Sequence, residues 1–191
     1  MLLSAFSPNL IEAGVDEAGR GCLAGPVVAA AVILPKKYQH EWLTDSKKLN
    51  KKQREELRLE IERQAIGIGI GLASPQEIDQ INILQASTLA MHRAIEQLRP
   101  FPELLLIDGK YFKPYPLILH ECIVKGDGKF LSIAAASVVA KTERDRLMEK
   151  YAQEFPFYAW ESNVGYPTKA HYEAIKKHGI TDLHRRSFRL E

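Results

Sequence analysis

Acidic residues stand at three places where a predicted strand runs into a glycine. The first place holds the pair Asp16-Glu17, and the other two hold the single aspartates Asp108 and Asp127. Ligands of open α/β sheets bind outside the carboxyl ends of the strands, and carboxylates that gather there repel one another unless a cation lies between them. A single Asp-Gly pair is typical of an ordinary turn. Three such places at successive strand ends favour a shared metal site.

The ligand type narrows the choice of metal. Oxygen ligands without Cys or His close by favour Mg²⁺ or Mn²⁺ over zinc. Asp16 and Glu17 are neighbours, so on a regular strand their side chains would point to opposite faces. We therefore expect the strand to end or bulge at this pair, which Gly19 and Gly21 would allow.

A glycine turn and two basic segments surround the acidic positions. Gly19-Arg20-Gly21 allows backbone N–H groups to approach a ligand and adds a guanidinium for phosphate, although an ordinary tight turn has the same pattern. Residues 45–54 hold five Lys or Arg against one Asp (+4), and residues 165–191 hold six against three acids (+3). A polyanionic substrate requires such patches, but a solvated helix face is an equally simple interpretation. Tyr166, between Gly165 and Pro167, is expected to stack on a sugar or base, or else to pack in the protein.

Hydrophobic periodicity predicts the elements that position these residues. Apolar runs predict strands over 11–16, 27–34, 65–73, 104–108 and 117–124. Helical spacing, with caps at Asn50 and Ser74, predicts helices over 51–64, from 75 to about 98, from 131 to about 154 and over 169–178. In the second of these helices, the spacing places Leu84, Met91, Ile95 and Leu98 on one apolar stripe. In the third strand, alternate glycines leave one face bare, so another element can approach closely. The pattern predicts an α/β fold with a mixed sheet.

Composition excludes several classes of protein. The chain has 191 residues, 46% hydrophobic and 26% charged, with a net charge of +2, which suits one globular domain over 1–191. No stretch approaches the roughly 20 apolar residues of a membrane span. No Lys or Arg precedes Glu12, so a secretory leader is not expected and the cytoplasm is the default. Cys22 and Cys122 lack zinc spacing and are expected to be free thiols. We expect a monomer.

Seven motifs, in order and spacing, resemble those of the ribonuclease HII family over about residues 11–188. They are Gly14–Gly21 (GVDEAGRG), Asp45–Leu49 (DSKKL), Ile107–Gly109 (IDG), Lys125–Asp127 (KGD), Ala134–Lys141 (AAASVVAK) with Arg144-Asp145, Gly165–Thr168 (GYPT) and His184–Phe188 (HRRSF). The resemblance implies an RNase H-like fold, with a mixed sheet flanked by helices and a short C-terminal helical segment.

The resemblance also implies an activity and a site. The activity is an endonuclease that cuts RNA in RNA–DNA hybrids, and 5′ to single ribonucleotides in duplex DNA, by two-metal-ion hydrolysis with Mn²⁺ or Mg²⁺. The products carry 3′-OH and 5′-phosphate ends. By this resemblance the catalytic metal ligands are Asp16, Glu17, Asp108 and Asp127. The resemblance also implies that Gly19, Arg20 and Gly21 contact the 2′-OH and the neighbouring phosphates. It implies that Tyr166 contacts the deoxyribose and that Lys47 contacts a phosphate.

The sequence departs from the family pattern in two places, and three other functions are alternatives to this interpretation. Val164 stands where relatives often have Lys, and the chain stops soon after Phe188; both bear on affinity rather than chemistry. The closest alternative is a ribonuclease HIII-like enzyme, which normally carries an additional N-terminal domain. The others are a catalytically inert hybrid-binding module and a Mg²⁺-dependent phosphotransferase, for which the phosphate-binding loop GxxxxGK[ST] is absent.

Overall fold

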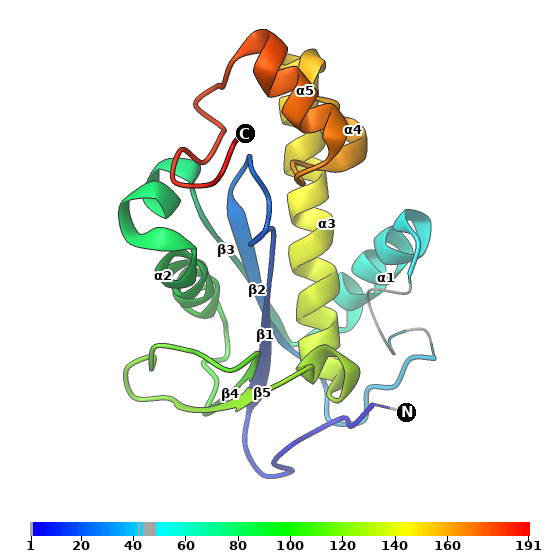
Figure 1. Cartoon of the computed structure of the whole chain (residues 1–191). Coiled ribbons are helices and arrows are strands. Elements are labelled where there is room, and N and C mark those ends of the chain that lie inside the picture. Colours follow the sequence, from blue (N-terminus) through cyan, green and yellow to red (C-terminus); the bar gives the residue numbers. More distant parts are fainter. Residues whose placement is uncertain (1, 42, 44–48) are drawn as a thin grey trace.

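The computed structural model describes residues 2–41, 43 and 49–191. The predicted phosphate contact Lys47 therefore lies outside the described residues. Five strands form one sheet in the order β3-β2-β1-β4-β5 (Figure 1). Their bounds are β1 Glu12–Ala18, β2 Val27–Ile33, β3 Gly67–Ala73, β4 Leu104–Asp108 and β5 Leu119–Ile123. β1, β2 and β3 pair antiparallel, whereas β4 is parallel to both β1 and β5, so the predicted mixed sheet is confirmed.

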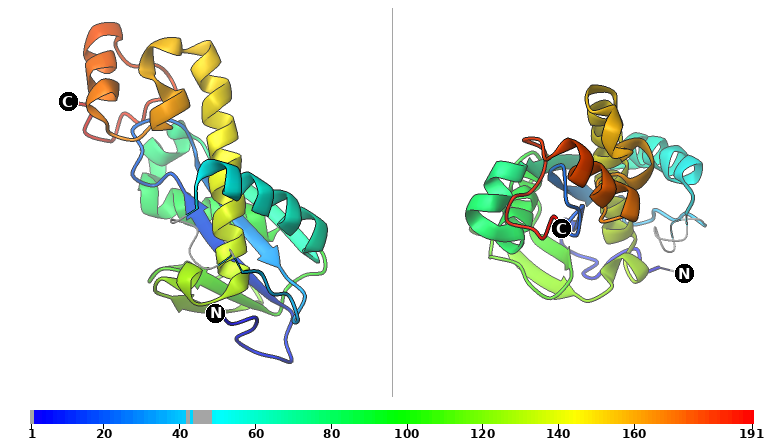
Figure 2. Two further views of the ribbon diagram at one scale, coloured as in Figure 1. Left: turned by 90° about the vertical axis from the view of Figure 1, so that its right-hand side faces the viewer. Right: turned by 45° about the horizontal axis from the view of Figure 1, so that its top comes forward.

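Helices cover both faces of the sheet. α2 (Pro75–Ile95) lies on one face, and α1 (Lys51–Gln64) and α3 (Leu131–Glu154) lie on the other (Figures 1 and 2). The C-terminal part adds α4 (Trp160–Asn163) and α5 (Lys169–His178), and the described residues also form two short 3₁₀ helices, η2 (Gly126–Gly128) and η3 (Pro156–Tyr158). Among the described helices, none has the length and apolar character to cross a membrane.

Local sequence sets where α1 and α2 begin. Asn50 accepts a hydrogen bond from the Gln53 backbone while the Gln53 side chain accepts one from the Asn50 backbone, which is the predicted capping box. Ser74 and Glu77 form the same reciprocal pair at α2. Both helix starts were predicted from these residues and are confirmed.

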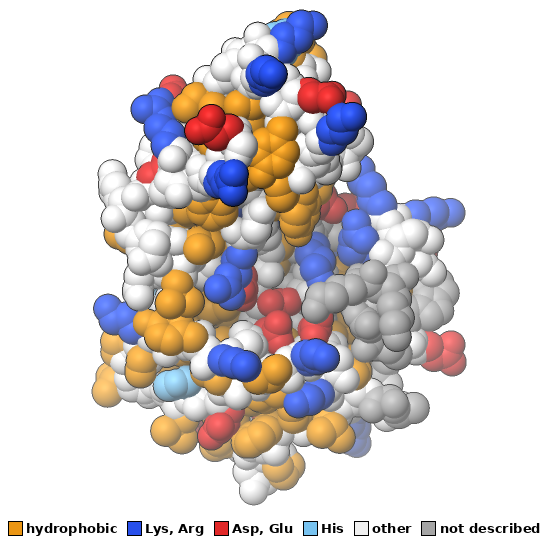
Figure 3. Space-filling view, in the orientation of Figure 1, with side chains coloured by type: hydrophobic (Ala, Val, Ile, Leu, Met, Phe, Trp, Pro, Cys, Tyr) orange, Lys and Arg blue, Asp and Glu red, His pale blue; other side chains and the backbone are white. Residues whose placement is uncertain are grey.

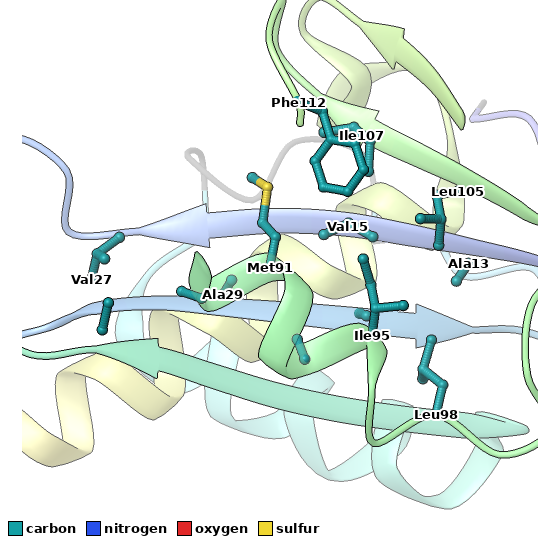
Figure 4. Close-up of a cluster of buried hydrophobic side chains, with 14 of the residues drawn as sticks. Ala13, Val15, Val27, Ala29, Met91, Ile95, Leu98, Leu105, Ile107 and Phe112 are labelled. Carbon is teal, nitrogen blue, oxygen red and sulfur yellow. The ribbon is translucent and has the colours of Figure 1, made fainter. Parts of the chain in front are cut away.

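The glycine face of β3 lies directly against α2. A Cβ atom at Gly69 would come within 1.9 Å of the Ala94 carbonyl oxygen, and one at Gly71 within 2.1 Å of the Ala90 carbonyl oxygen. The predicted close approach is therefore made by α2. Its buried side chains, among them Met91 and Ile95, fill the core between helix and sheet with residues of β1, β2 and β4 (Figure 4).

One prediction about α2 is wrong. The expected buried stripe ran through Leu84, Met91, Ile95 and Leu98, but Leu84 is 36% exposed while the other three are buried. Asn82 has a φ of +65°, and its side chain accepts hydrogen bonds from the backbones of Leu84 and Gln85. This side chain caps a new helical segment, and Leu84 lies in the first turn of that segment, where it lines a surface hollow together with Met91.

The opposite face of the sheet is packed by the small residues of α3. A Cβ atom at Gly14 would come within 2.1 Å of the Ser132 carbonyl carbon, so β1 and the first turn of α3 touch backbone to backbone. The following turns bury Ala134, Ala135 and Ala136. This close contact brings Ser137 and Lys141 of the same helix beside the carboxyl-terminal half of β1.

Candidate active site

A cavity of about 660 Å³ opens at the carboxyl end of β1. Asp16, Glu17 and Asp108 line it together with Gly19, Arg20, Gly21 and Tyr166. Acidic side chains lie in a hollow of this face, with Lys and Arg side chains around it (Figure 3). The structure thus brings seven of the nine predicted site residues to one cavity.

The expected end or bulge of the strand at Asp16 is wrong. β1 continues to Ala18, and Asp16 and Glu17 keep regular pairing with Ala30 and Ala29 of β2. The two side chains therefore project to opposite faces. Both still reach the cavity because the pairing of β1 with β4 stops at Val15, which leaves this edge of β1 open beside Asp108.

Asp16 is a buried carboxyl without a full counter-charge. Burial, and then the neighbouring Glu17 and Asp108 carboxylates, raise its pKa to about 8. A hydrogen bond with Ser137 and the charge of Lys141 act in the opposite direction but do not offset burial. A group with these surroundings accepts a cation readily, because a cation removes both the desolvation penalty and the repulsion.

Glu17, on the other side of the strand, is also a buried carboxyl without a full counter-charge. Its Oε1 lies 3.0 Å from Nη1 of Arg20, whereas its Oε2 is buried and has no hydrogen-bond partner among the described residues. Burial raises the pKa of Glu17, the Arg20 charge opposes this shift, and Asp108 adds to it. The unpartnered oxygen suits a hard cation with oxygen ligands.

Asp108 and Asp127 belong to adjacent turns. Asp108 Oδ1 accepts a hydrogen bond of 2.7 Å from the Gly126 backbone N–H, which ties the end of β4 to η2. Asp127 is 4% exposed in that short helix and does not line the cavity. Within the described ranges, no three Asp, Glu, His or Cys side chains are placed to hold one ion as they stand. The carboxylates fit a divalent cation by chemistry, and holding it requires their side chains to reorient.

The glycine turn divides into a packed half and an open half. Gly19 has a φ of +92°, and a Cβ atom there would lie 2.0 Å from Nε of Arg144. A Cβ atom at Gly21 would meet nothing within 4 Å among the residues that the structure describes, although Gly21 lines the cavity. Protein packing therefore explains Gly19, whereas the bare backbone at Gly21 leaves room for a ligand.

Tyr166 projects from a loop that is held through its backbone. The residue is 47% exposed and lines the cavity, as the stacking interpretation requires. Its N–H donates to the Asn163 carbonyl at 2.8 Å, and its carbonyl lies 3.0 Å from Nδ1 of His171. The ring is therefore available to a ligand while the loop beneath it is fixed.

The basic segments are only partly surface patches. Lys51 and Arg54 line the cavity but are paired with Glu149 and Asp145 of α3. In the C-terminal segment, the expected patch is wrong at Arg185, which is fully buried. His171 and His184 are also buried there. The reason is that residues 183–185 pack against the segment after β1 and share backbone hydrogen bonds with it.

Sequence reasoning missed the histidine network under Tyr166. The Thr181 N–H donates to His184 Nδ1, so His184 carries its proton on Nε2, which lies 3.3 Å from His171 Nε2. Trp160 Nε1 donates to the same His171 atom at 3.0 Å, so His171 carries its proton on Nδ1 and donates it to the Tyr166 carbonyl. The network is complete only when both rings are neutral. Isolated histidines in a basic segment give no sequence signal for such a pairing.

This network predicts a pH dependence of stability. Burial, and then the neighbouring His171, lower the pKa of His184 from 6.5 to about 4. Because the pKa of His184 is lower in the folded state, neutral His184 stabilises the fold fully above pH 6.5. This stabilisation declines by about 3 kcal/mol, for one proton, as the pH falls toward 4. In urea unfolding at several pH values, the gap between wild type and His184→Gln should narrow by about this amount. A gap that stays constant would contradict the neutral pairing.

Comparisons with known proteins agree over the whole chain. A family model described as Ribonuclease HII matches residues 13–191. The Ribonuclease HII of Parabacteroides distasonis is 62% identical over 190 residues, which is 100% of this chain and 96% of that protein. The structure of ribonuclease H2 from Pyrococcus horikoshii is similar with a TM-score of 0.77 and 28% identity, and the match covers 94% of each chain.

A more distant structure bears on the ribonuclease HIII alternative. Bst-RNase HIII in complex with Mn²⁺ shares the fold with a TM-score of 0.72 but only 18% identity, and the match covers 98% of this chain and 68% of that one. The predicted RNase H-like fold is confirmed by these likenesses. The identity over full length decides between the two families: the chain belongs to the ribonuclease HII family and is a ribonuclease H endonuclease.

Proposed function

We propose that the chain cleaves the RNA strand of RNA–DNA hybrids and the 5′ side of single ribonucleotides in duplex DNA, with Mn²⁺ or Mg²⁺ as cofactor. The observation that carries the proposal is a pair of buried carboxyl groups near the carboxyl end of β1. The pKa of Asp16 is raised to about 8, and Glu17 has a buried oxygen that finds no hydrogen-bond partner in the described part of the chain. The family supports ribonuclease H activity, and the carboxylates supply a place for it.

Asp16, Glu17, Asp108 and Asp127 are the residues that would hold the metal. Bound divalent ions supply stabilisation of the charge on the scissile phosphate and activation of a water molecule. Lys141 adds a fixed positive charge on the α3 side, close enough to lower the pKa of Asp16. Burial of these groups strengthens every electrostatic interaction with a phosphate that enters the cavity.

Selection of a ribonucleotide is assigned to the glycine turn. The open space beside Gly21 allows a ribose to approach the backbone, where N–H and C=O groups can satisfy a 2′-OH that is both donor and acceptor. Arg20, half exposed beside Glu17, offers donors to a neighbouring phosphate. Because these contacts involve no base edge, we expect little sequence preference, and binding that weakens steeply with salt.

The test is cleavage of three labelled duplexes: a uniform RNA–DNA hybrid, duplex DNA with one ribonucleotide, and all-DNA of the same sequence. We expect cuts in the first two, with the single cut mapped to the 5′ side of the ribonucleotide and a 3′-OH end. EDTA should abolish both, and titration with Mg²⁺ and Mn²⁺ measures the preference. Binding without cleavage would support the inert-module alternative, and cleavage of the all-DNA duplex would remove the assigned role of the 2′-OH.

Removing the Tyr166 ring separates stacking from packing. Because the ring is half exposed, Tyr166→Ala should lower the unfolding free energy by no more than about 1 kcal/mol. Cleavage at a single embedded ribonucleotide should fall at least tenfold, about 1.4 kcal/mol in the activation barrier. Tyr172→Ala is a control from α5, outside the cavity lining. Equal losses of activity and melting temperature in Tyr166→Ala would support the packing interpretation.

The monomeric state and the cytoplasmic location expected from the sequence stay predictions. Size-exclusion chromatography with light scattering tests the first, and it matters for the assays because a second copy near the cavity would change access of a duplex.

A further inference from the structure

One arginine of α3 joins the two loops to which substrate recognition is assigned. Arg144 is 2% exposed and donates three hydrogen bonds to backbone carbonyls. Nε and Nη2 bind Pro26 and Ala24, which belong to the segment 19–26 between β1 and β2, here called the glycine loop. Nη1 binds Val164, which belongs to residues 163–167, here called the tyrosine loop, at 2.8 Å. A single guanidinium therefore bridges both loops.

Glycines of both loops pack against this guanidinium. A Cβ atom at Gly19 would lie 2.0 Å from Arg144 Nε, and Cβ atoms at Gly165 and Gly25 would lie 3.3 and 3.4 Å from Nη2. All three glycines have positive φ, between +82° and +92°. The positive φ values and the missing side chains allow the backbone of each loop to pack closely around Arg144. A loop that only connects two elements would not require this close contact.

Further contacts fix the same spacing. Arg185, fully buried, donates from Nε to the Gly25 carbonyl and from Nη1 to the Arg20 carbonyl, both at 3.0 Å. The Leu23 N–H donates directly to the Gly165 carbonyl at 2.8 Å. The glycine loop is therefore held from beneath by two arginines and from one side by the tyrosine loop.

We infer that Arg144 is a positioning residue that sets the distance between Gly19–Gly21 and Tyr166, and thereby the preference for a ribonucleotide followed by a deoxyribonucleotide over continuous RNA. This inference rests on the proposed function. A continuous RNA strand offers a ribose at every step, so the glycine loop can select it wherever the strand binds. A single ribonucleotide must meet the glycine loop while the next sugar meets Tyr166, so only this substrate depends on the spacing of both loops.

The chemistry of the guanidinium explains why lysine cannot replace it. Arg144 presents a rigid planar set of donors to three carbonyls on two segments, whereas an ammonium is a compact group on a flexible stem. Arg144→Lys keeps the charge but not the bridge. A matched control is Arg58→Lys: Arg58 of α1 is 5% exposed and binds the Val139 carbonyl and Thr142 Oγ1 of α3, which belong to neither loop.

The experiment measures kcat/KM on duplex DNA with one ribonucleotide and on a uniform RNA–DNA hybrid, each variant being assayed well below its own Tm. The readout is the kcat/KM on the single-ribonucleotide duplex divided by the kcat/KM on the hybrid. We expect the ratio to fall at least tenfold in Arg144→Lys and to stay within twofold of wild type in Arg58→Lys. A merely structural role would lower both activities together and leave the ratio unchanged.

Each outcome decides the inference. A fall of less than tenfold in Arg144→Lys, or a comparable fall in Arg58→Lys, overturns it. If Arg144→Lys does not fold, Arg185→Lys is judged by the same criteria, because it releases the Arg20 carbonyl and shifts the glycine loop relative to Tyr166. A wild-type enzyme that fails to cut the single-ribonucleotide duplex contradicts the proposed function instead, so the two failures are distinguishable.

Discussion

Asp16→Asn should reduce cleavage of both hybrid and single-ribonucleotide substrates by at least a thousandfold, about 4 kcal/mol in the activation barrier. The substitution keeps the size of the side chain and removes its negative charge, and a neutral amide is a poor ligand for Mg²⁺ or Mn²⁺. Asp16 is also the most deeply placed of the cavity carboxylates, between Ser137 and Lys141 on one side and Glu17 and Asp108 on the other. Its loss cannot be replaced by a neighbour from the same face.

The same substitution should leave the fold intact, or stabilise it. In metal-free buffer above pH 8, Asp16 is ionised and repelled by Glu17 and Asp108, so Asn removes an unfavourable interaction. We expect the Tm in EDTA to be equal to or higher than that of wild type. Added Mg²⁺ should raise the Tm of wild type more than that of the variant, because a ligand that binds only the folded state stabilises it.

Asp182→Asn provides the control for this comparison. Asp182 is exposed, and its Oδ1 lies 3.3 Å from Nη2 of Arg186, four residues later in the chain. Because exposed ion pairs contribute little, neutralising Asp182 should leave cleavage and the response of the Tm to metal close to wild type. Near-normal cleavage by Asp16→Asn would remove Asp16 from the metal site. A large drop in its Tm would mean that the charge serves the fold instead of the reaction.

Those parts of the fold that depend on local chemistry were predictable from the sequence. The capping boxes at Asn50 and Ser74 mark helix starts because the side chain and the backbone that bond each other are three residues apart. The glycines of β3 predicted a close neighbour because their alternation leaves a bare face, although the sequence did not identify that neighbour as α2. The positions of Asp16, Glu17 and Asp108 near the carboxyl ends of β1 and β4 predicted that they share one cavity, because these two parallel strands end at the same edge of the sheet.

What could not be predicted depends on residues distant in sequence. The restart of α2 at Asn82 is set by a side-chain cap inside an otherwise helical pattern, and β1 passes through Asp16 and Glu17 because β2 continues to pair with them. Arg144, Arg185, His171 and His184 read as surface charge in a basic segment or a charged helix. Arg185 and His184 are buried because residues 183–185 pack on the glycine loop, and Arg144 and His171 are buried by contacts with the glycine and tyrosine loops and with Trp160. No local pattern encodes these contacts.

Gly21→Ala should abolish most cleavage without affecting stability. Within the described part of the chain, a methyl group at this position meets no atom within 4 Å beyond its chain neighbours, and Gly21 does not have a positive φ, so the folded state accommodates alanine. The same methyl group would occupy the space assigned to the ribose. We expect cleavage to fall at least a hundredfold, about 3 kcal/mol in the barrier, with the Tm unchanged.

Gly19→Ala is the matched comparison two residues earlier. Its φ of +92° and the Arg144 Nε atom 2.0 Å from the added Cβ make alanine strained there, so both the Tm and the activity should fall, the unfolding free energy by about 2 kcal/mol or more. The two variants together separate a glycine required by the protein from one required by its ligand. If Gly21→Ala cleaved as well as wild type, the substrate would not approach this backbone, and selection of the 2′-OH would have to come from another part of the cavity.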